Sequence, residues 1–151
     1  SILSQRFKEI AYLNKGFTDH FRNEWQAELF ESEPQEVTFL FEGGIAEFVE
    51  SLNKTRNPLH KKPVYIEKKI ETTYVEAALQ WNDGFSESVF AFANTINNID
   101  GGSHITGIRA AITRVLNDYG RKEKLIKEGE ENLAGEDTRA GLAAIVSVKI
   151  P

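Results

Sequence analysis

The chain has 151 residues, of which 40% are hydrophobic and 27% charged, a composition typical of one globular domain rather than of a disordered polypeptide. Its 18 basic and 23 acidic side chains give a net charge of -5, so the surface as a whole does not attract nucleic acid, although local basic patches can. The absence of cysteine excludes disulfides, zinc–thiolate sites and thiol nucleophiles.

The apolar runs are too short to cross a membrane, and the first residues lack the basic and apolar regions of a signal peptide. We therefore expect a cytoplasmic protein with no membrane partner. The chain contains no methionine, and its first residue, Ser1, suits either removal of an initiator methionine or a piece of a longer polypeptide.

The first third of the chain predicts a helix followed by two strands. Ser4 is expected to cap the helix, which ends at Lys15-Gly16, and strands are expected over 17–22 and 37–41. We interpret the acidic stretch between the strands as a solvated loop. Its marker residues are Glu24, Glu28, Glu31, Glu33, Pro34 and Glu36.

The middle of the chain predicts a short helix and then a pair of strands. Gly43 and Gly44 turn the chain into the helix. Its apolar face consists of Ile45, Phe48, Val49 and Leu52. Residues 75–81 and 88–94 alternate with the period of strands. Asn82-Asp83-Gly84 between them supplies the positive-φ residue that a tight hairpin requires, so we expect these two strands to pair.

The clearest helix begins at the turn Asp100-Gly101-Gly102-Ser103, where we expect a cap, and ends at Gly120. Its apolar stripe consists of Ile105, Ile108, Ile112, Val115, Leu116 and Tyr119. A short helix over 136–142 and a strand over 143–150 follow. Short helices against a mostly antiparallel sheet make this an α+β domain.

The sequence lacks the commonest signatures of catalysis and nucleotide binding. There is no G-x-S-x-G elbow, no G-x-x-x-x-G-K-[ST] loop and no G-x-G-x-x-G fingerprint. His20, His60 and His104 are far apart in the sequence, so we expect no metal site.

Two weaker candidates for chemistry have simpler interpretations. Gly101-Gly102-Ser103 could offer backbone N–H groups to a phosphate, but a capped turn is the favoured interpretation. The carboxylates of Glu128, Glu130 and Glu131 lie in a polar stretch, so we interpret them as solvated side chains rather than as a catalytic acid and base.

Basic residues form two groups that could neutralise DNA phosphates. They are Lys54, Arg56, Lys61, Lys62, Lys68 and Lys69, and then Arg109, Arg114, Arg121, Lys122, Lys124 and Lys127. The alternative is that these charges line a solvated face, and the pattern by itself favours it. Composition and spacing thus predict a domain with a sheet and basic patches, and they select no function.

Five segments, in order along nearly the whole chain, resemble the DNA gyrase B family. They are Lys8 to Asn14, Phe41 to Lys54, Ala78 to Phe85, Asn97 to Arg114 and Gly135 to Lys149. The motif residues that we expect to be structural are Gly43, Gly44, Trp81, Asn82, Asp83, Gly84, Gly101, Gly102, Ser103 and His104. Trp25 to Pro34 is the segment least similar to the family.

The resemblance covers one part of the gyrase B protein, the transducer domain that follows the ATPase domain, over residues 1–151. It implies a ribosomal-protein-S5-domain-2-like fold, with helices packed on one face of a mostly antiparallel sheet and a left-handed β-α-β crossover, a hand that periodicity cannot predict. The family is an ATP-dependent type II topoisomerase. The implied role of this domain is to couple ATP-driven gate closure to DNA strand passage and supercoiling, and to line the DNA cavity.

The resemblance also implies what lies outside these residues. The ATPase domain precedes this domain in the family, and a glutamine-threonine-lysine loop, whose lysine reaches the terminal phosphate of ATP, would follow Pro151. We therefore expect no catalytic residue, nucleotide-binding residue or cofactor in this chain, and ATP with Mg²⁺ in the full-length protein. The implied partners are a DNA duplex, the gyrase A protein and a second copy of gyrase B that binds through the N-terminal region.

One site residue is implied by the resemblance. Arg109 matches an arginine that faces the DNA cavity, where a long cation could contact backbone phosphate without reading bases. The competing interpretation is a structural ion pair. Two alternatives also remain for the whole chain: the topoisomerase IV counterpart of the transducer, or a stand-alone S5-like module that binds nucleic acid.

Overall fold

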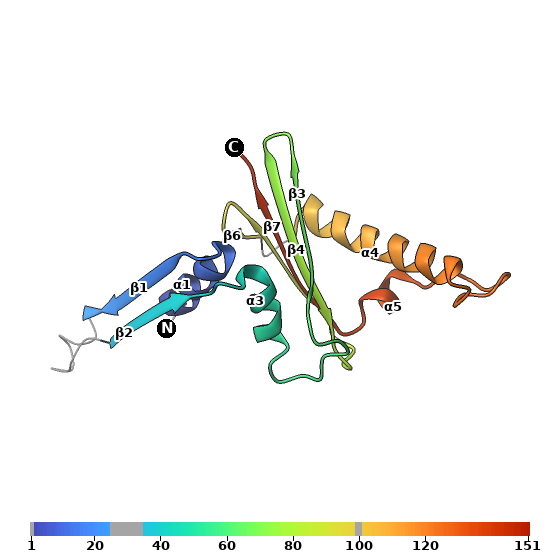
Figure 1. Ribbon diagram of the computed structural model, residues 1–151, viewed down its shortest axis with the longest axis horizontal. Helices are drawn as coiled ribbons and strands as arrows, with labels where there is room; N and C mark the ends of the chain where they lie inside the picture. The colour runs from blue at the N-terminus through green and yellow to red at the C-terminus, as the bar shows by residue number, and fades with distance from the viewer. Residues whose placement is uncertain (1, 25–34, 99–100) are drawn as a thin grey trace. The chain divides into compact units, whose positions relative to one another are not determined.

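The computed structural model describes residues 2–24, 35–98 and 101–151 (Figure 1). These residues form two compact units, Ser1–Phe48 and Val49–Pro151, which are described separately. The acidic residues between 25 and 34 and the turn residue Asp100, for which the sequence made predictions, lie outside the described residues.

The first unit packs a helix on a strand pair. Helix α1 (Ile2–Leu13) precedes strands β1 (Thr18–Asn23) and β2 (Gln35–Leu40), which pair antiparallel. Aromatic contacts hold this unit together. The ring centroids of Phe7 in α1 and Phe21 in β1 are 5.3 Å apart. The ring of Tyr12 stacks on those of Phe41 and Phe48, with centroid distances of 3.6 and 4.6 Å. The predicted helix and strands are therefore confirmed, with small shifts in their ends.

Two predictions in this unit were wrong. Ser4 lies inside α1 instead of capping it, because the helical conformation already begins at Ile2. Glu36 belongs to β2 and not to a solvated loop, since it is the cross-strand partner of Arg22, with Nη1 and Oε1 3.4 Å apart. Helix α3 (Gly44–Leu52) begins at the predicted glycine turn and continues into the second unit.

The second unit contains a sheet whose described strands have the order β3-β4-β7-β5-β6. Their bounds are β3 (Val64–Ile70), β4 (Thr73–Trp81), β5 (Ser88–Ala93), β6 (Ile96–Asn97) and β7 (Leu142–Lys149). All pairs are antiparallel except β5 with β7, which run parallel. The α+β class with a mostly antiparallel sheet is confirmed.

The predicted hairpin at Asn82-Asp83-Gly84 was wrong. Strands β4 and β5 are not neighbours, because β7 lies between them and pairs with both. None of these three residues adopts a positive φ. The chain does change direction here, but the shared partner of both strands is β7, a segment far along the chain.

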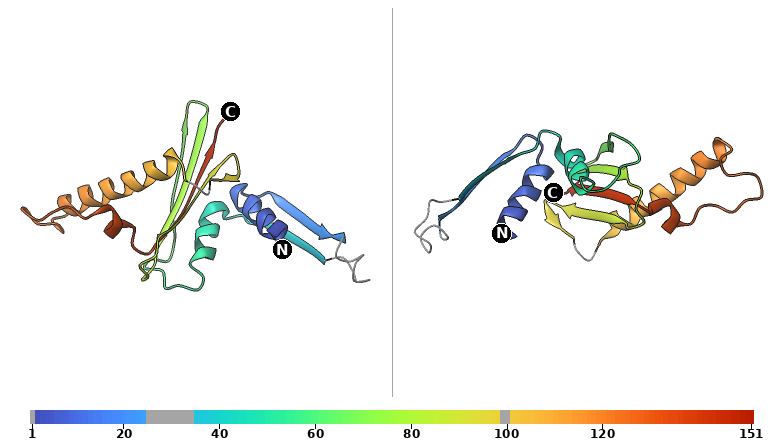
Figure 2. Two further views of the ribbon diagram at one scale, coloured as in Figure 1. Left: turned by 180° about the vertical axis from the view of Figure 1, so that it is seen from behind. Right: turned by 90° about the horizontal axis from the view of Figure 1, so that it is seen from below.

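The parallel pair requires a crossover connection, and two helices supply it. Helices α4 (Ser103–Lys122) and α5 (Gly135–Arg139) lie between β5 and β7 in the chain and side by side in space (Figures 1 and 2). Ile108, Ile112 and Leu116 of α4 pack on the sheet. The sheet residues in this core are Ala77, Leu79, Leu142, Ala144 and Val146. This is the β-α-β unit that the resemblance implies, and its left hand stays a prediction.

The ends of α4 and part of its stripe differ from the prediction. Gly102 is the N-cap residue and no side chain caps it, so Ser103 begins the helix instead of capping it. The helix continues through the predicted stop at Gly120 to Lys122. Val115 and Tyr119 are both 57% exposed, so this part of the predicted stripe is not covered by the sheet.

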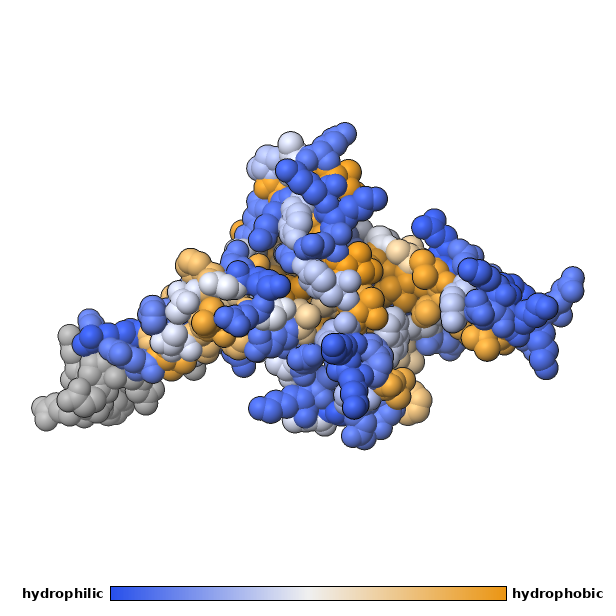
Figure 3. Space-filling view, in the orientation of Figure 1, coloured by the Kyte–Doolittle hydropathy of each residue, from blue (hydrophilic) through white to orange (hydrophobic). Residues whose placement is uncertain are grey.

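An apolar groove lies between α4 and strands β3 and β4. Its volume is about 310 Å³, and its lining includes Ile66, Trp81, Val115 and Leu116. Figure 3 shows this surface as the orange area beside α4.

The junction between Asn82 and Gly141 fixes where β7 enters the sheet. Asn82 donates its backbone N–H to the carbonyl oxygen of Gly141 at 2.9 Å, one residue before Leu142 pairs with Trp81. Gly141 has a φ of +71°, and a Cβ there would overlap the carbonyl oxygens of Asn82 and Gly84. Only glycine fits this position without moving a neighbouring backbone.

We predict that Gly141→Ala destabilises the chain far more than Gly129→Ala. Both glycines have positive φ, but a Cβ at Gly129 meets nothing within 4 Å. Gly129→Ala should therefore cost only the left-handed conformation, about 1–2 kcal/mol. Gly141→Ala adds a backbone overlap and should cost on the order of 3 kcal/mol or more. Denaturant unfolding of the two variants measures the difference, and equal losses would contradict this role for the junction.

Candidate functional site

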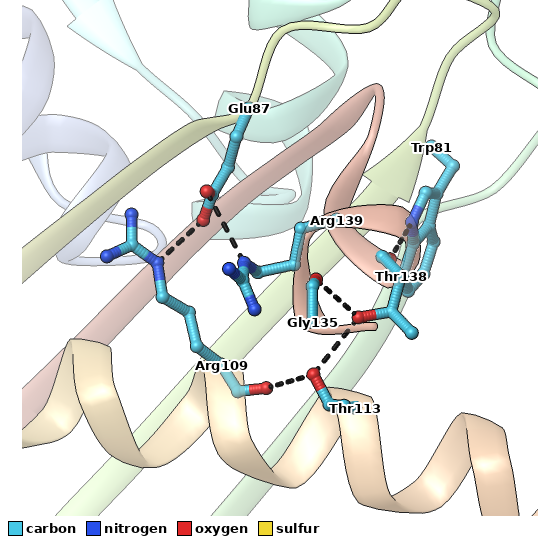
Figure 4. Close-up of polar contacts among 7 residues, drawn as sticks. All are labelled: Trp81, Glu87, Arg109, Thr113, Gly135, Thr138 and Arg139. Atoms are coloured by element: carbon cyan, nitrogen blue, oxygen red, sulfur yellow. Dashed lines mark hydrogen bonds and ion pairs between the residues drawn. The ribbon is translucent and has the colours of Figure 1, made fainter. Parts of the chain in front are cut away.

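The carboxylate of Glu87 brings two arginines together. Glu87 immediately precedes β5, and its Oε1 accepts from Nε of Arg109 on α4 at 2.7 Å. Its Oε2 lies 3.4 Å from Nε of Arg139 at the end of α5 (Figure 4). The side chains of Arg109, Glu87 and Arg139 are 43%, 25% and 18% exposed. The crossover therefore delivers one cation from each of its helices to a single acid.

Hydroxyl groups behind this cluster connect the helices to each other and to the sheet. Thr113 donates to the carbonyl oxygen of Arg109 at 3.0 Å, and its hydroxyl lies 3.0 Å from that of Thr138 on α5. The indole N–H of Trp81, at the end of β4, donates to the carbonyl oxygen of Thr138 at 3.0 Å. Figure 4 shows these contacts in a continuous chain from Arg109 to Trp81. These contacts connect the backbone near both arginines to strand β4.

The two arginines and one carboxylate leave a local charge of about +1 at neutral pH. Both ion pairs use the Nε atoms. The terminal Nη groups of Arg109 have no hydrogen-bond partner among the described residues. The ion pair that one interpretation of Arg109 expected is present, and its outer donors also remain available to an anion.

The motif at residues 81–84 sits in a network of buried amides. Asn53 donates to Oε1 of Gln80 at 2.9 Å, and Asn82 donates to Oδ1 of Asn53 at 3.0 Å. These three side chains are between 2% and 3% exposed. Gly84 N–H donates to Oδ1 of Asn82 at 2.9 Å, and Asp83 Oδ2 accepts from Asn57 at the same distance. The network ties the segment after α3 to the end of β4.

The other glycine motifs mark the starts of helices. Gly44 has a φ of +60° and begins α3, and Gly43 N–H donates to Oε2 of Glu47 at 3.2 Å. A Cβ at Gly102 would lie 2.8 Å from the imidazole of His104. The Nε2 atom of that imidazole is buried and has no partner among the described residues.

The remaining candidates are dispersed within the described part of the chain. Arg121 donates to the carbonyl oxygens of Lys127 and Glu130, so it closes the loop after α4. Arg56 donates to Oγ of Ser88 at 3.2 Å. Residues 2–24, 35–98 and 101–151 contain no group of three or more His, Asp or Glu side chains that could hold a metal ion.

Sequence reasoning missed Glu87 and the role of Asn53. Glu87 is one acid among 23 Asp and Glu residues, and no periodicity distinguishes it. Asn53 lies one residue beyond an amphipathic helix, where an exposed polar side chain is the ordinary expectation. Both are found only when the strand order brings distant segments together.

A second polar cluster lies on the β3–β4 pair. Glu67 and Glu76 are cross-strand partners, an unfavourable pairing of like charges. The hydroxyl of Tyr65 lies 2.7 Å from Glu76 Oε1 and 2.9 Å from Glu67 Oε2, and Tyr74 donates to Glu67 Oε2 at 2.6 Å. Partial burial and these two carboxylates raise the pKa of Tyr65, and the hydrogen bond to Glu67 is the main cause of the raised pKa of Tyr74.

None of the described helices is both long enough and apolar enough to cross a membrane.

Comparisons with known proteins agree on one family. A family model described as DNA gyrase B matches residues 44–151. The DNA gyrase B protein of Halalkalibacterium halodurans is 48% identical over 99% of this chain, and that of Clostridium acetobutylicum is 46% identical over 98%. The chain spans 22% of the length of each of these relatives. The 43K ATPase domain of Thermus thermophilus gyrase B, solved with an aminocoumarin, matches with a TM-score of 0.85 and 33% identity over 99% of this chain and 39% of that one.

We predict that the tyrosine cluster makes the chain less stable at alkaline pH. The folded state holds the protons of Tyr65 and Tyr74 more tightly than the unfolded state, in which a tyrosine pKa is about 10. The two tyrosines therefore make their full contribution to the free energy of unfolding below about pH 10. That contribution is lost as the pH rises toward their raised pKa values in the folded state. Denaturant unfolding between about pH 9 and 11 should show a smaller loss of stability for Tyr65→Phe than for the unmodified chain. Equal losses would contradict the prediction.

Proposed function

This chain belongs to the DNA gyrase B family, and we propose that it is the transducer domain of an ATP-dependent type II topoisomerase, acting on DNA in the cytoplasm. In this role it couples ATP-driven gate closure elsewhere in the protein to DNA strand passage and supercoiling. The observation that carries the proposal is the match of 99% of the chain to part of the Thermus thermophilus 43K ATPase domain of gyrase B. The polar contacts that connect α4, α5 and Trp81 of β4 also support the proposal, because a domain that transmits a movement needs its elements linked to one another.

We propose that ATP and Mg²⁺ bind to parts of the gyrase B protein outside this chain. The sequence contains neither of the common glycine-rich phosphate-binding signatures. In the family, the lysine of the glutamine-threonine-lysine loop would place its ammonium on the terminal phosphate as a point charge. The coupling therefore needs this domain together with its neighbours, the gyrase A protein and a second copy of gyrase B.

We propose that Arg109 contacts the phosphate backbone of the enclosed duplex. Its side chain is 43% exposed, and its Nη donors are unused among the described residues. Contacts of this kind position a duplex without reading its sequence. The ion pair with Glu87 and the phosphate contact are compatible because they use different nitrogens of one guanidinium.

We predict that the purified 151-residue chain neither binds nor hydrolyses ATP. A phosphate-release assay with the full-length gyrase B protein as the positive control measures turnover. ATP hydrolysis that follows the chain through successive chromatographic steps, instead of separating from it as a contaminant, would contradict the prediction.

We predict that Arg109→Gln in the full-length protein impairs supercoiling more than stability. Loss of a charge-assisted hydrogen bond of about 1.5–3 kcal/mol corresponds to roughly a tenfold or greater loss of strand passage. A partly exposed ion pair contributes only about 0–1 kcal/mol to folding. Neutral glutamine is preferable to charge reversal, which would place a second carboxylate against Glu87.

Arg114→Gln is the matched control for this experiment. Arg114 lies on the same helix and is exposed, and it forms no ion pair among the described residues. Supercoiling by this variant should remain within about twofold of the unmodified enzyme. Unchanged supercoiling and unchanged ATP coupling in Arg109→Gln would remove Arg109 from the DNA interface.

A further inference from the structure

We infer that Glu87 is a positioning residue. It orients the guanidinium of Arg109 toward DNA phosphate by accepting one hydrogen bond from Nε. The inference rests on the proposed function, because it assigns a means of orientation to the same phosphate contact. Glu87 itself is an acid and would repel a phosphate. Its effect on DNA must therefore pass through the arginine that it holds.

The choice of nitrogen decides what the ion pair does. Glu87 Oε1 contacts Arg109 at Nε, 2.7 Å away, and not at the terminal Nη groups. A guanidinium is planar, so a bond at Nε together with the side-chain stem fixes the direction of the whole fork. The Nη groups then present their N–H donors in the geometry that binds phosphate oxygens bidentately.

The second arginine contacts the other oxygen of the carboxylate and is not needed for the pair with Arg109. Oε2 of Glu87 lies 3.4 Å from Nε of Arg139, which is only 18% exposed. The two oxygens of Glu87 thus contact one arginine from α4 and one from α5 (Figure 4). Arg139 is the more buried of the two arginines, and Arg109 is the one that faces solvent.

Charge counting and positioning predict opposite results for Glu87→Gln. If only charge matters, removing an acid strengthens DNA binding at every salt concentration. If Glu87 positions Arg109, the variant loses a phosphate contact despite its more positive charge. Each lost phosphate contact reduces the magnitude of the slope of log affinity against log salt by about 0.9. Between about 50 and 200 mM salt, that difference amounts to roughly threefold in relative affinity.

The test uses the full-length gyrase B protein and measures the apparent DNA affinity from DNA-stimulated ATP hydrolysis at several salt concentrations. Glu87→Gln is expected to reduce the magnitude of the salt slope by about 0.9 and Glu87→Asp, which keeps the charge, by less. Arg139→Gln is the matched structural control, since it removes the tie to α5 but leaves the 2.7 Å pair of Arg109 and Glu87. Its slope should stay near that of the unmodified protein.

A double variant separates the two levels of the proposal. In the Arg109→Gln background, Glu87→Gln should cause no further change in slope, because the contact that it supports is already absent. If Arg109→Gln lowers the magnitude of the slope and Glu87→Gln does not, the positioning role is wrong and the phosphate contact stands. If Arg109→Gln itself leaves the slope unchanged, the phosphate contact is wrong. A loss of slope in Arg139→Gln equal to that in Glu87→Gln would show a general structural effect and would overturn the inference.

Discussion

The close approach of Gly141 to the carbonyl oxygens of Asn82 and Gly84 is the constraint on which the rest of the second unit depends. A backbone with positive φ and no Cβ lets β7 start beside the end of β4. From that start, β7 forms backbone hydrogen bonds with β4 on one side and β5 on the other, and residues 142–147 are buried. A strand buried between two neighbours contributes most of its apolar surface to the core, so the entry point of β7 determines the packing of the sheet.

The same strand order creates the candidate site. Since β5 and β7 are parallel neighbours, the chain between them must cross from one end of the sheet to the other. That crossover is α4 and α5, and it delivers Arg109 and Arg139 to Glu87 at the start of β5. The hydrogen bond from Trp81 to α5 fixes the crossover to β4. The core and the arginine pair are therefore two results of one topology.

For the proposed contact with DNA, local charge is relevant and net charge is not. The chain carries a net charge of -5, yet fields at physiological salt decay over about 8 Å. At Glu87 itself two arginines contact one carboxylate, which leaves a small positive cluster on an acidic protein. The carboxylate weakens the attraction of such a site for phosphate, and in the proposed positioning role it improves the orientation of Arg109. This balance suits the proposed role, in which the domain positions a duplex and releases it again.

The sequence by itself determined the family and the type of most elements in the described chain, because local periodicity and glycine motifs depend on neighbouring residues. It did not predict β3 or β6. The ends of the strand over 142–149 and of the helix over 103–122 were predicted to within a few residues. The partner of each strand was not: Asn82-Asp83-Gly84 has the composition of a hairpin turn, but β7 lies between the strands on either side of it. Arg109 could be named from its motif, whereas Glu87 and Asn53 could not. Glu87 contacts Arg109, 22 positions away in the chain, and Asn53 contacts Gln80, 27 positions away. Only the tertiary structure decides contacts between residues so far apart.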